Sequence, residues 1–404
     1  MQLKKNIILL IFLSLIARLS SAYFFHDLKI ENEWGILLNN LVQFQTYAFY
    51  TEGNFLIPSV LMPPLYAYFI YAIKILTFNS ANFIYILIFV QIIVSTLSVY
   101  FFYKINVKIF SENICLINSY IFCLFPLNVY AAGQISSITL QIFLLIIFFL
   151  FTFKLSENKN LKNHLLFSLL AGLLILIRGE FILILFFTLF YLLIKKKIKI
   201  KSFILLGLVT LLFISPYLVR NYNIFNKIIL VKSLGINLWK GNNEFSKIQG
   251  YENLENENFL NIKNKIEGLE KDIFYELKRD KIFLHEGLKN IKEKPFNYSY
   301  LFLKKIFSFY FFDFQSNYPN YYNLFHILPI LVISVVSFLG LILTFKKKEF
   351  KLTFLKNYMF LTIIIFSIFF ILPRYKLTIL PVQIIFAGYF IEYLLKKKFT
   401  NTTR

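Results

Sequence analysis

Two carboxylates, Glu31 and Glu33, follow the first apolar stretch and have the type and position for acid–base chemistry. They stand six to eight residues past a predicted membrane helix (7–25), in Ile30-Glu31-Asn32-Glu33-Trp34-Gly35. A carboxylate just outside a membrane helix can act as a general base or bind a metal ion where a reacting group arrives from the bilayer. The alternative is a solvated loop that is acidic because it is external. Spacing alone leaves both interpretations open.

Arg178 and Glu180 are a second candidate pair. They interrupt the apolar stretch from Leu165 to Ile194, where charges are costly and usually functional. The alternative is a tight hairpin tip at the membrane interface, turned by Gly179, where both charges are hydrated.

Two more arginines, Arg220 and Arg374, stand at the outward ends of predicted spans. External arginines run against the positive-inside preference, so a bound anion would explain them. A guanidinium group pairs with phosphate oxygens in a bidentate way, which suits the phosphate or pyrophosphate of a lipid. The alternative is that each arginine reaches toward ordinary lipid headgroups.

Other catalytic and metal-binding patterns are missing from the sequence. His26, His164, His285 and His326 lack metal-ligand spacing, and the two cysteines share one apolar run, where packing is expected. The chain has no Walker motif, glycine-rich phosphate loop or serine-nucleophile elbow. We therefore predict no protein metal site and no certain cofactor, with a divalent cation left open.

The composition requires a membrane. Of the 404 residues, 58% are hydrophobic and 20% are aromatic, against about 45–50% apolar in soluble domains. The net charge of +22 comes largely from lysine runs between apolar segments, which favours cytoplasmic loops and argues against nucleic-acid binding. The sequence predicts an all-α membrane protein, a polytopic helical bundle of about 10–11 spans with external loop regions. The predicted spans are 7–25, 82–103, 114–131, 137–153, 163–178, 180–194, 202–219, 324–345, 353–372 and 375–395, with the first expected to remain uncleaved.

Charge sets the expected orientation. The lysine runs 195–201 and 346–348 are expected in the cytoplasm and 220–323 outside, and 16 of the 21 acidic residues lie in 26–58 or 220–323. The N-terminus and Lys195 are both expected in the cytoplasm, which requires an even number of crossings between them. With segment 60–78 counted, the number of apolar segments is odd, so one early segment is not expected to cross. The Pro63-Pro64 pair favours 60–78 as that segment. We therefore expect an N-terminal transmembrane module (1–219) with an external loop (26–58), an external region (220–323) with helices, and C-terminal transmembrane helices (324–404).

The chain resembles the C-type integral-membrane glycosyltransferases, specifically the bacterial family-39-like group related to aminoarabinose and mannosyl transferases. The resemblance runs along almost the whole chain and rests on short motifs. These are the acidic segment after the first helix with Asn40-Leu41, Met62-Pro63-Pro64-Leu65-Tyr66, Leu176-Ile177-Arg178-Gly179-Glu180, Pro216 to Tyr222 followed by Asn237 to Asn242, and Arg374-Tyr375-Lys376-Leu377 with Pro381.

The chain departs from that family's pattern at two places. Ile30-Glu31 stands where the family has an Asp-Glu pair, and 133–139 carries no acid where a second one is often found. The resemblance implies a GT-C-like fold and an active site at the outer leaflet. It also implies that Glu31 or Glu33 is the catalytic base, and that Arg178, Arg220, Arg374, Tyr222 and Asn242 bind the lipid phosphate or sugar.

The function that the resemblance implies is transfer of a hexosyl or pentosyl group from a polyprenyl-phosphate donor to an envelope acceptor by single displacement. The acceptor would be a lipid, glycan or protein, and the site would lie in a multi-pass protein of the inner (plasma) membrane. The rival class is a non-enzymatic lipid-glycan flippase or secondary transporter. Transporters often carry internal repeats and charges near the membrane midplane. No repeat is visible, and the candidate charges lie at external helix ends.

Overall fold

The computed structural model describes residues 2–30, 32–78, 80 and 82–402, and this part of the chain is helical apart from one small hairpin. The N-terminal helices are α1 (Gln2–Phe25), α2 (Asn32–Phe44), α3 (Pro64–Leu76), α4 (Phe83–Asn106), α5 (Glu112–Leu124), α6 (Pro126–Ala131), α7 (Ile138–Glu157), α8 (Leu161–Ile177), α9 (Phe181–Ile194) and α10 (Ile200–Phe225). The later elements are α11 (Leu234–Gly241), η1 (Glu257–Phe259), α12 (Leu260–Glu267), α13 (Tyr275–Glu293), α14 (Pro295–Tyr310), α15 (Leu324–Thr344), α16 (Phe350–Ile368), η2 (Pro373–Thr378) and α17 (Leu380–Thr402).

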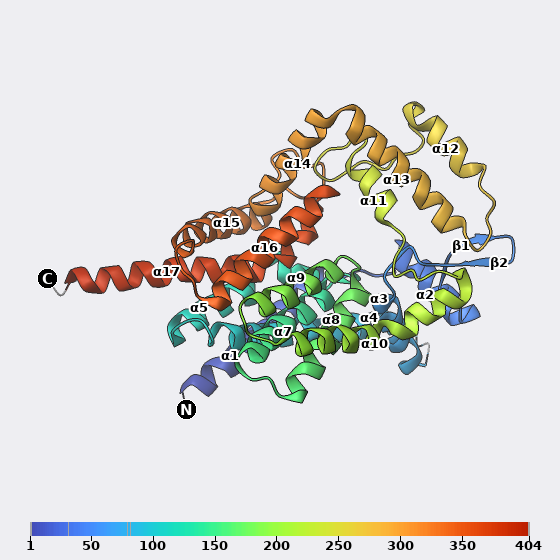
Figure 1. Cartoon of the computed structure of the whole chain (residues 1–404). Helices are drawn as coiled ribbons and strands as arrows, with labels where there is room; N and C mark the ends of the chain where they lie inside the picture. Colours follow the sequence, from blue (N-terminus) through green and yellow to red (C-terminus); the bar gives the residue numbers. More distant parts are fainter. Residues whose placement is uncertain (1, 31, 79, 81, 403–404) are drawn as a thin grey trace.

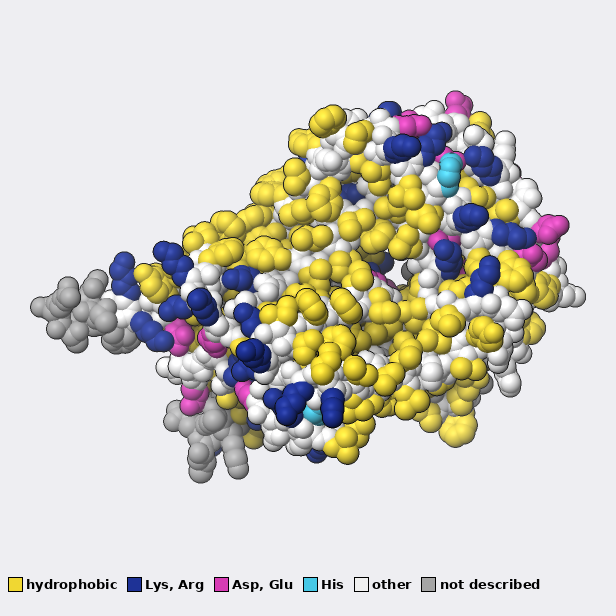
Figure 2. All heavy atoms as spheres, in the orientation of Figure 1, with side chains coloured by type: hydrophobic (Ala, Val, Ile, Leu, Met, Phe, Trp, Pro, Cys, Tyr) yellow, Lys and Arg dark blue, Asp and Glu magenta, His cyan; other side chains and the backbone are white. Residues whose placement is uncertain are grey.

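The predicted fold class is confirmed. Six described helices (α1, α4, α7, α10, α15 and α16) are long and apolar enough to cross a membrane. Each of the ten predicted spans corresponds to an apolar helix or a broken pair of helices. Apolar side chains also cover much of the outer surface of these helices (Figure 2), as expected where a protein faces lipid rather than water.

The helices form one elongated assembly (Figure 1). The beginning of α1 and the end of α17 lie toward the same end of the molecule, and the hairpin with α12 and α13 lies toward the opposite end. Helices α4, α7 and α8 pack side by side, and α15 packs along α17. That last contact is close, because a Cβ atom on Gly340 would meet the Phe386 carbonyl oxygen at 1.9 Å.

One predicted span, 114–131, is broken. Pro126 has no N–H, so α5 ends at Leu124 and α6 begins at Pro126. Two side chains donate hydrogen bonds to carbonyl oxygens of the preceding turn: Asn128 Nδ2 donates to Phe122 O (3.1 Å) and Arg18 Nη1 to Cys123 O (3.0 Å). Because unpaired backbone groups at membrane depth are expensive, these two bonds make the break tolerable.

The first loop, 26–58, forms a hairpin that the sequence did not predict. Strands β1 (Ala48–Glu52) and β2 (Phe55–Pro58) pair antiparallel, with the tight turn at Gly53, whose φ of 54° favours glycine. Helix α3 follows. Its 13 residues reach about 20 Å at about 1.5 Å per residue, short of the roughly 30 Å hydrocarbon core. Helices α5 and α9 are about as short, so length alone does not single out 60–78 as the segment that fails to cross.

The region 220–323, which the sequence predicts to be external, folds around a small aromatic core of its own, with Trp239, Phe259 and Phe283 buried in it. The region contains helices, as predicted: α12 and α13 are separated by 268–274, and the aromatic and basic α14 follows α13.

Candidate functional site

Asp27, two residues past α1, holds the first loop against the segment between α6 and α7. Its Oδ2 accepts a hydrogen bond from the Ile135 N–H (2.6 Å), and its own N–H donates to Gly133 O (3.2 Å). The side chain is half-buried. One carboxylate oxygen is therefore fixed by the backbone, and no hydrogen bond to the other is found among the described residues.

The two predicted catalytic carboxylates stand close to Asp27 in the chain. Glu33 lies in the first turn of α2 and is exposed, while Glu31 lies outside the described residues. If the segment were helical at both positions, the two side chains would point in different directions, so a base drawn from it is expected to be one carboxylate rather than a pair. The choice between Glu31 and Glu33 stays a prediction.

An aromatic and amide network connects this segment to the Pro-Pro element. The rings of Trp34 and Tyr66 meet edge to face at 4.8 Å. Tyr66 donates its O–H to Gln91 Oε1 (2.7 Å), and Gln91 Nε2 donates to Gln134 O (2.9 Å). The start of α2, the start of α3, α4 and the 133–138 segment thus share one end of the bundle, which makes this end the candidate active site.

Arg220, near the C-terminal end of α10, donates hydrogen bonds to the backbone of the first loop. Its Nη1 donates to Ser59 O (2.8 Å) and to Asn221 Oδ1 (2.7 Å), and its Nη2 donates to Tyr47 O (3.0 Å). The guanidinium group also lies over the Tyr47 ring, 5.6 Å from its centre. Two of these hydrogen bonds, to Tyr47 O and Ser59 O, hold the two ends of the hairpin; its predicted role in phosphate binding stays a prediction.

Glu276 of α13 holds the same loop from the other side. Its Oε2 accepts from the Val60 N–H (2.7 Å), and the side chain is almost fully buried. Burial raises the pKa of Glu276 to about 7, although hydrogen bonds from Val60, Ser59 and Leu61 oppose the shift. The first loop is therefore clamped between α10 and α13.

Arg178 and the C-terminal motif come together. Arg178 Nε donates to Glu180 Oε1 (2.5 Å), and its guanidinium lies over the rings of Phe366 (5.0 Å) and Tyr375 (4.6 Å). Both members of the ion pair are partly exposed, as a hairpin tip requires. Arg374, next to Tyr375, is exposed and has no ion pair with a described carboxylate. Two motifs 196 positions apart in the chain (178 and 374) thus meet at η2.

The remaining predicted residues divide between surface and interior. Tyr222 is exposed. Asn242 is buried and donates to Leu238 O and Ile368 O (both 2.9 Å), so it links the end of α11 to the end of α16. Lys305 Nζ donates to Gly241 O (2.8 Å) and Phe369 O (2.5 Å) nearby.

Two buried lysines were not among the predicted residues. Lys305 is fully buried, and this burial lowers its pKa to about 7. Lys376 is almost fully buried and contacts the carbonyl oxygens of Phe309, Tyr310 and Phe311, the last turn of α14. Ammonium groups are favourable at helix C-termini, where carbonyl groups lack intrahelical partners. Lys376 lies in the C-terminal motif Arg374-Tyr375-Lys376-Leu377, whereas nothing in the sequence distinguished Lys305 from the other lysines.

A small cavity of about 20 Å³ lies beside η2, lined among others by Asp313, His326 and Lys376. That volume has room for about one water molecule and none for a sugar. Within the described residues, no group of three or more His, Cys, Asp and Glu side chains is arranged to hold a metal ion. Asp27 and Glu33, the candidate carboxylates that the structure describes, therefore belong to no such group.

Comparison with known proteins supports the resemblance on which the site residues rest. Residues 62–219 match the family model of dolichyl-phosphate-mannose-protein mannosyltransferases. This segment contains the Pro-Pro element and Arg178, and it excludes the acidic segment after α1, Arg220 and Arg374. No curated protein matches the chain.

Two solved structures share the fold. The oligosaccharyltransferase AglB from Archaeoglobus fulgidus, in complex with an inhibitory peptide and a dolichol-phosphate, is similar over 98% of this chain and 50% of that chain, with 12% identity and a TM-score of 0.57. The apo form of the Archaeoglobus fulgidus oligosaccharyltransferase is similar over 98% of this chain and 51% of that chain, with 13% identity and a TM-score of 0.55. This chain spans about half the length of these proteins. The fold is that of a GT-C-type membrane glycosyltransferase, which confirms the resemblance inferred from the sequence.

Asp27 is the residue that the sequence analysis passed over. It was counted among the external acids, and the base was sought at Glu31 and Glu33 because they fitted the family's acidic segment. Asp27 is the first acid after α1, and its position two residues past the helix was the available signal. Its bond to Ile135, 108 positions away, could not be read from the sequence.

Proposed function

We propose that this protein transfers a sugar from a polyprenyl-phosphate-linked donor to an acceptor of the cell envelope, and that it does so in the plasma membrane. The observation that carries the proposal is the shared fold: a protein of the same architecture has been solved with a dolichol-phosphate and an inhibitory peptide bound. The family match over 62–219 supports the same donor chemistry, since that family is described by dolichyl-phosphate-mannose. The acceptor class, whether lipid, glycan or protein, is left open.

The proposed reaction is a single displacement at the anomeric carbon. A carboxylate of the segment after α1 (Asp27, Glu31 or Glu33) takes the proton from the acceptor hydroxyl or amine. The acceptor atom bonds to the anomeric carbon as the bond from that carbon to the phosphate oxygen breaks, and the lipid phosphate leaves with the bonding electrons.

The leaving phosphate gains negative charge, and cations held in place beforehand stabilise such charge most effectively. Arg374 is exposed, and the guanidinium group of Arg178 lies over the ring of the adjacent residue, Tyr375. We assign these two arginines to the phosphate in the first place. Arg220, Tyr222 and Asn242 remain proposed contributors to donor binding, with Arg220 also positioning the first loop.

The test is reconstitution in liposomes with a polyprenyl-phosphate sugar labelled in the sugar, followed by separate assays for transfer and for movement of the intact donor across the bilayer. Labelled acceptor with release of polyprenyl phosphate is the expected result. Movement of the intact donor with no transfer to a mixed envelope extract would overturn the proposal and favour a flippase.

A further inference from the structure

The end of the bundle away from the candidate site carries an open groove of about 560 Å³ between α4, α7 and α8. Its wall is apolar, and Phe101, Ile147, Phe151 and Leu166 line it. Its rim is polar, formed by Lys154, Glu157, Asn158, Asn160, Lys162 and Asn163. A groove with an apolar wall and a basic rim is complementary to a molecule that has both an apolar and an anionic part.

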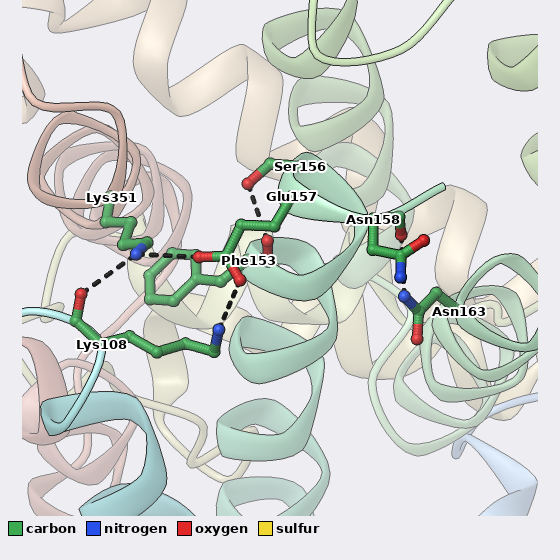
Figure 3. Close-up of polar contacts among 7 residues, drawn as sticks. All are labelled: Lys108, Phe153, Ser156, Glu157, Asn158, Asn163 and Lys351. Atoms are coloured by element: carbon green, nitrogen blue, oxygen red, sulfur yellow. Dashed lines mark hydrogen bonds and ion pairs between the residues drawn. The ribbon is translucent and has the colours of Figure 1, made fainter. Parts of the chain in front are cut away.

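The rim has more positive charge than its carboxylate can balance. Glu157 Oε2 pairs with Lys108 Nζ (2.5 Å) and its Oε1 with Lys351 Nζ (2.9 Å), so both of its oxygens are engaged (Figure 3). Neither Lys154 nor Lys162 has an ion pair with a carboxylate among the described residues. Lys154 lies instead over the Phe151 ring, 4.5 Å from its centre.

Several lysines repel one another at this rim. Lys104, Lys108 and Lys162 all act on Lys154 through their like charges. The rim and its surroundings thus carry at least five lysines (Lys104, Lys108, Lys154, Lys162 and Lys351) against one glutamate, Glu157, so positive charge is in excess here. An anion bound among these lysines would reduce their mutual repulsion. The positive-inside preference does not explain the clustering, because dispersed lysines would satisfy it equally well.

The loop at the rim is rigid. Asn160 Oδ1 accepts from the Asn163 N–H (2.9 Å) and caps α8, and Asn163 Nδ2 donates to Asn158 O (2.8 Å), as Figure 3 shows for the latter pair. The cap satisfies one amide of the first turn of α8. The free N–H groups of that turn and the helix dipole favour an anion at the same rim.

We propose that this groove binds the phosphate headgroup of an anionic membrane phospholipid, with the acyl chain along the apolar wall. The headgroup would lie between Lys154 and Lys162 beside the start of α8. A free phosphate ion would leave the apolar wall uncovered, so a lipid fits the groove better. The site lies at the other end of the bundle from the candidate active site and does not depend on the proposed reaction.

The experiment is a native mass spectrometry titration of the detergent-purified protein with phosphatidylglycerol, with phosphatidylcholine and inorganic phosphate as separate ligands. The double variant Lys154→Gln/Lys162→Gln is compared with Lys196→Gln/Lys347→Gln, which removes two exposed lysines from the neighbouring loops. We expect tight, stoichiometric binding of phosphatidylglycerol to the wild type. The groove variant should bind about 25-fold more weakly, because each basic residue near an anionic headgroup contributes about fivefold. The loop variant should change by less than about threefold.

Equal losses in the two double variants would overturn the proposal, since the lysines would then act only through the overall field. Equal binding of phosphatidylcholine would overturn it too, and so would binding of inorganic phosphate as tight as that of the lipid. If the groove variant does not fold, the single variant Lys162→Gln, at an exposed position, should still weaken phosphatidylglycerol binding about fivefold.

Discussion

The two places where arginines reach the external end of the bundle differ in what the arginines touch. Arg220 is hydrogen-bonded to backbone oxygens at Tyr47 and Ser59 and to the Asn221 side chain. Arg178 and Arg374 lie on or beside the ring of Tyr375, and Arg374 is exposed. In the sequence all three are arginines at the ends of apolar stretches. Their neighbours separate Arg220, which fixes a loop, from Arg178, which is paired with Glu180, and from Arg374, which has no ion pair with a described carboxylate.

Buried charges on the two sides of the external region show the same distinction. Glu276 accepts the Val60 N–H, and Lys305 donates to helix-end carbonyls. Each is hydrogen-bonded to the backbone of a distant segment, and both are too buried to contact a substrate. A charged residue at the edge of a membrane bundle is therefore a candidate ligand only if the backbone does not already use it.

The largest expected effect concerns the acidic segment. If Asp27 is the base, Asp27→Asn should lower the transfer rate by about 10²–10⁴-fold, because the acceptor proton has no other carboxylate in place. If Glu33 or Glu31 is the base, Glu33→Gln or Glu31→Gln should do so instead. Transfer rates with donor at saturation, measured for all three variants, identify the residue.

The control for this experiment is Glu52→Gln, a carboxylate of the same loop that pairs with Lys271 (2.6 Å) at the hairpin. It should transfer sugar at close to the wild-type rate. Mild and similar losses in all four variants would show that the segment after α1 is only a solvated acidic loop.

The second prediction concerns pH and the two buried charges. The pKa of Glu276 is raised to about 7, so its protonated form stabilises the fold and this stability is lost as pH rises from about 4.5 to 7. The pKa of Lys305 is lowered to about 7, so stability is regained as pH rises from about 7 toward 10.5. Each slope is at most about 1.4 kcal/mol per pH unit. The melting temperature in detergent should therefore pass through a dip near pH 7.

Matched variants separate the two slopes. Glu276→Gln should flatten the acid side of the dip and leave the alkaline side, and Lys305→Met should do the reverse. Two curves that stay parallel to the wild type would show that neither group changes its protonation on folding.

The third prediction sharpens the contrast between the arginines. Arg374→Ala should weaken donor affinity by about 10–100-fold with little change in melting temperature, because a charge-assisted hydrogen bond is lost from an exposed site. Arg178→Ala should also weaken donor affinity, and Arg→Lys at either position should restore it poorly, since the bidentate fork is missing. The measurement is donor binding by equilibrium titration alongside the melting curve.

Arg220→Ala should behave differently. Losing its bonds to Tyr47 and Ser59 should destabilise the protein by about 3 kcal/mol, and any loss of donor affinity should follow from the disturbed hairpin. Reduced donor affinity at an unchanged melting temperature would return Arg220 to the group of direct phosphate ligands.

The smallest effect is expected at Tyr222. Its ring is exposed, so Tyr222→Phe should leave stability within about 0.5 kcal/mol of the wild type. If its hydroxyl contacts the donor, affinity should fall a few-fold in the same titration. Asn242→Ala provides the contrast, since that amide is buried and bonds two helix ends, and its loss should lower the melting temperature. An unchanged affinity in Tyr222→Phe would remove Tyr222 from the site.

The fold was largely predictable, because apolar length is a strong signal. Each of the ten predicted spans corresponds to an apolar helix or a broken pair of helices, and the hydrophilic block 220–323 is a region with its own small core. The breaks were harder to predict. Pro126 divides a single apolar stretch. The sequence could not show that Arg18 and Asn128 would donate hydrogen bonds to the carbonyl oxygens before that break. The hairpin at 48–58 was also missed, since its strands are short and bounded by a single glycine.

The site was predictable as a set of segments and less so as a set of contacts. The motif around Arg178 and the motif around Arg374 do meet through Tyr375. What the sequence could not convey is which hydrogen bonds are already made, because those depend on backbone atoms far away in the chain. Arg220 and Asn242 look like ligands by residue type, and their observed partners are carbonyl oxygens.

The clamp on the first loop has a consequence for synthesis. Ser59 is bonded to Arg220, and Val60 to Glu276, 161 and 216 positions later in the chain. At about 5–20 residues per second, translation delivers these partners roughly 10–40 seconds after the hairpin has emerged. Neither clamp is available until Arg220 has been made, so the hairpin should be cut by protease in nascent chains stalled before α10, and it should resist protease in full-length chains.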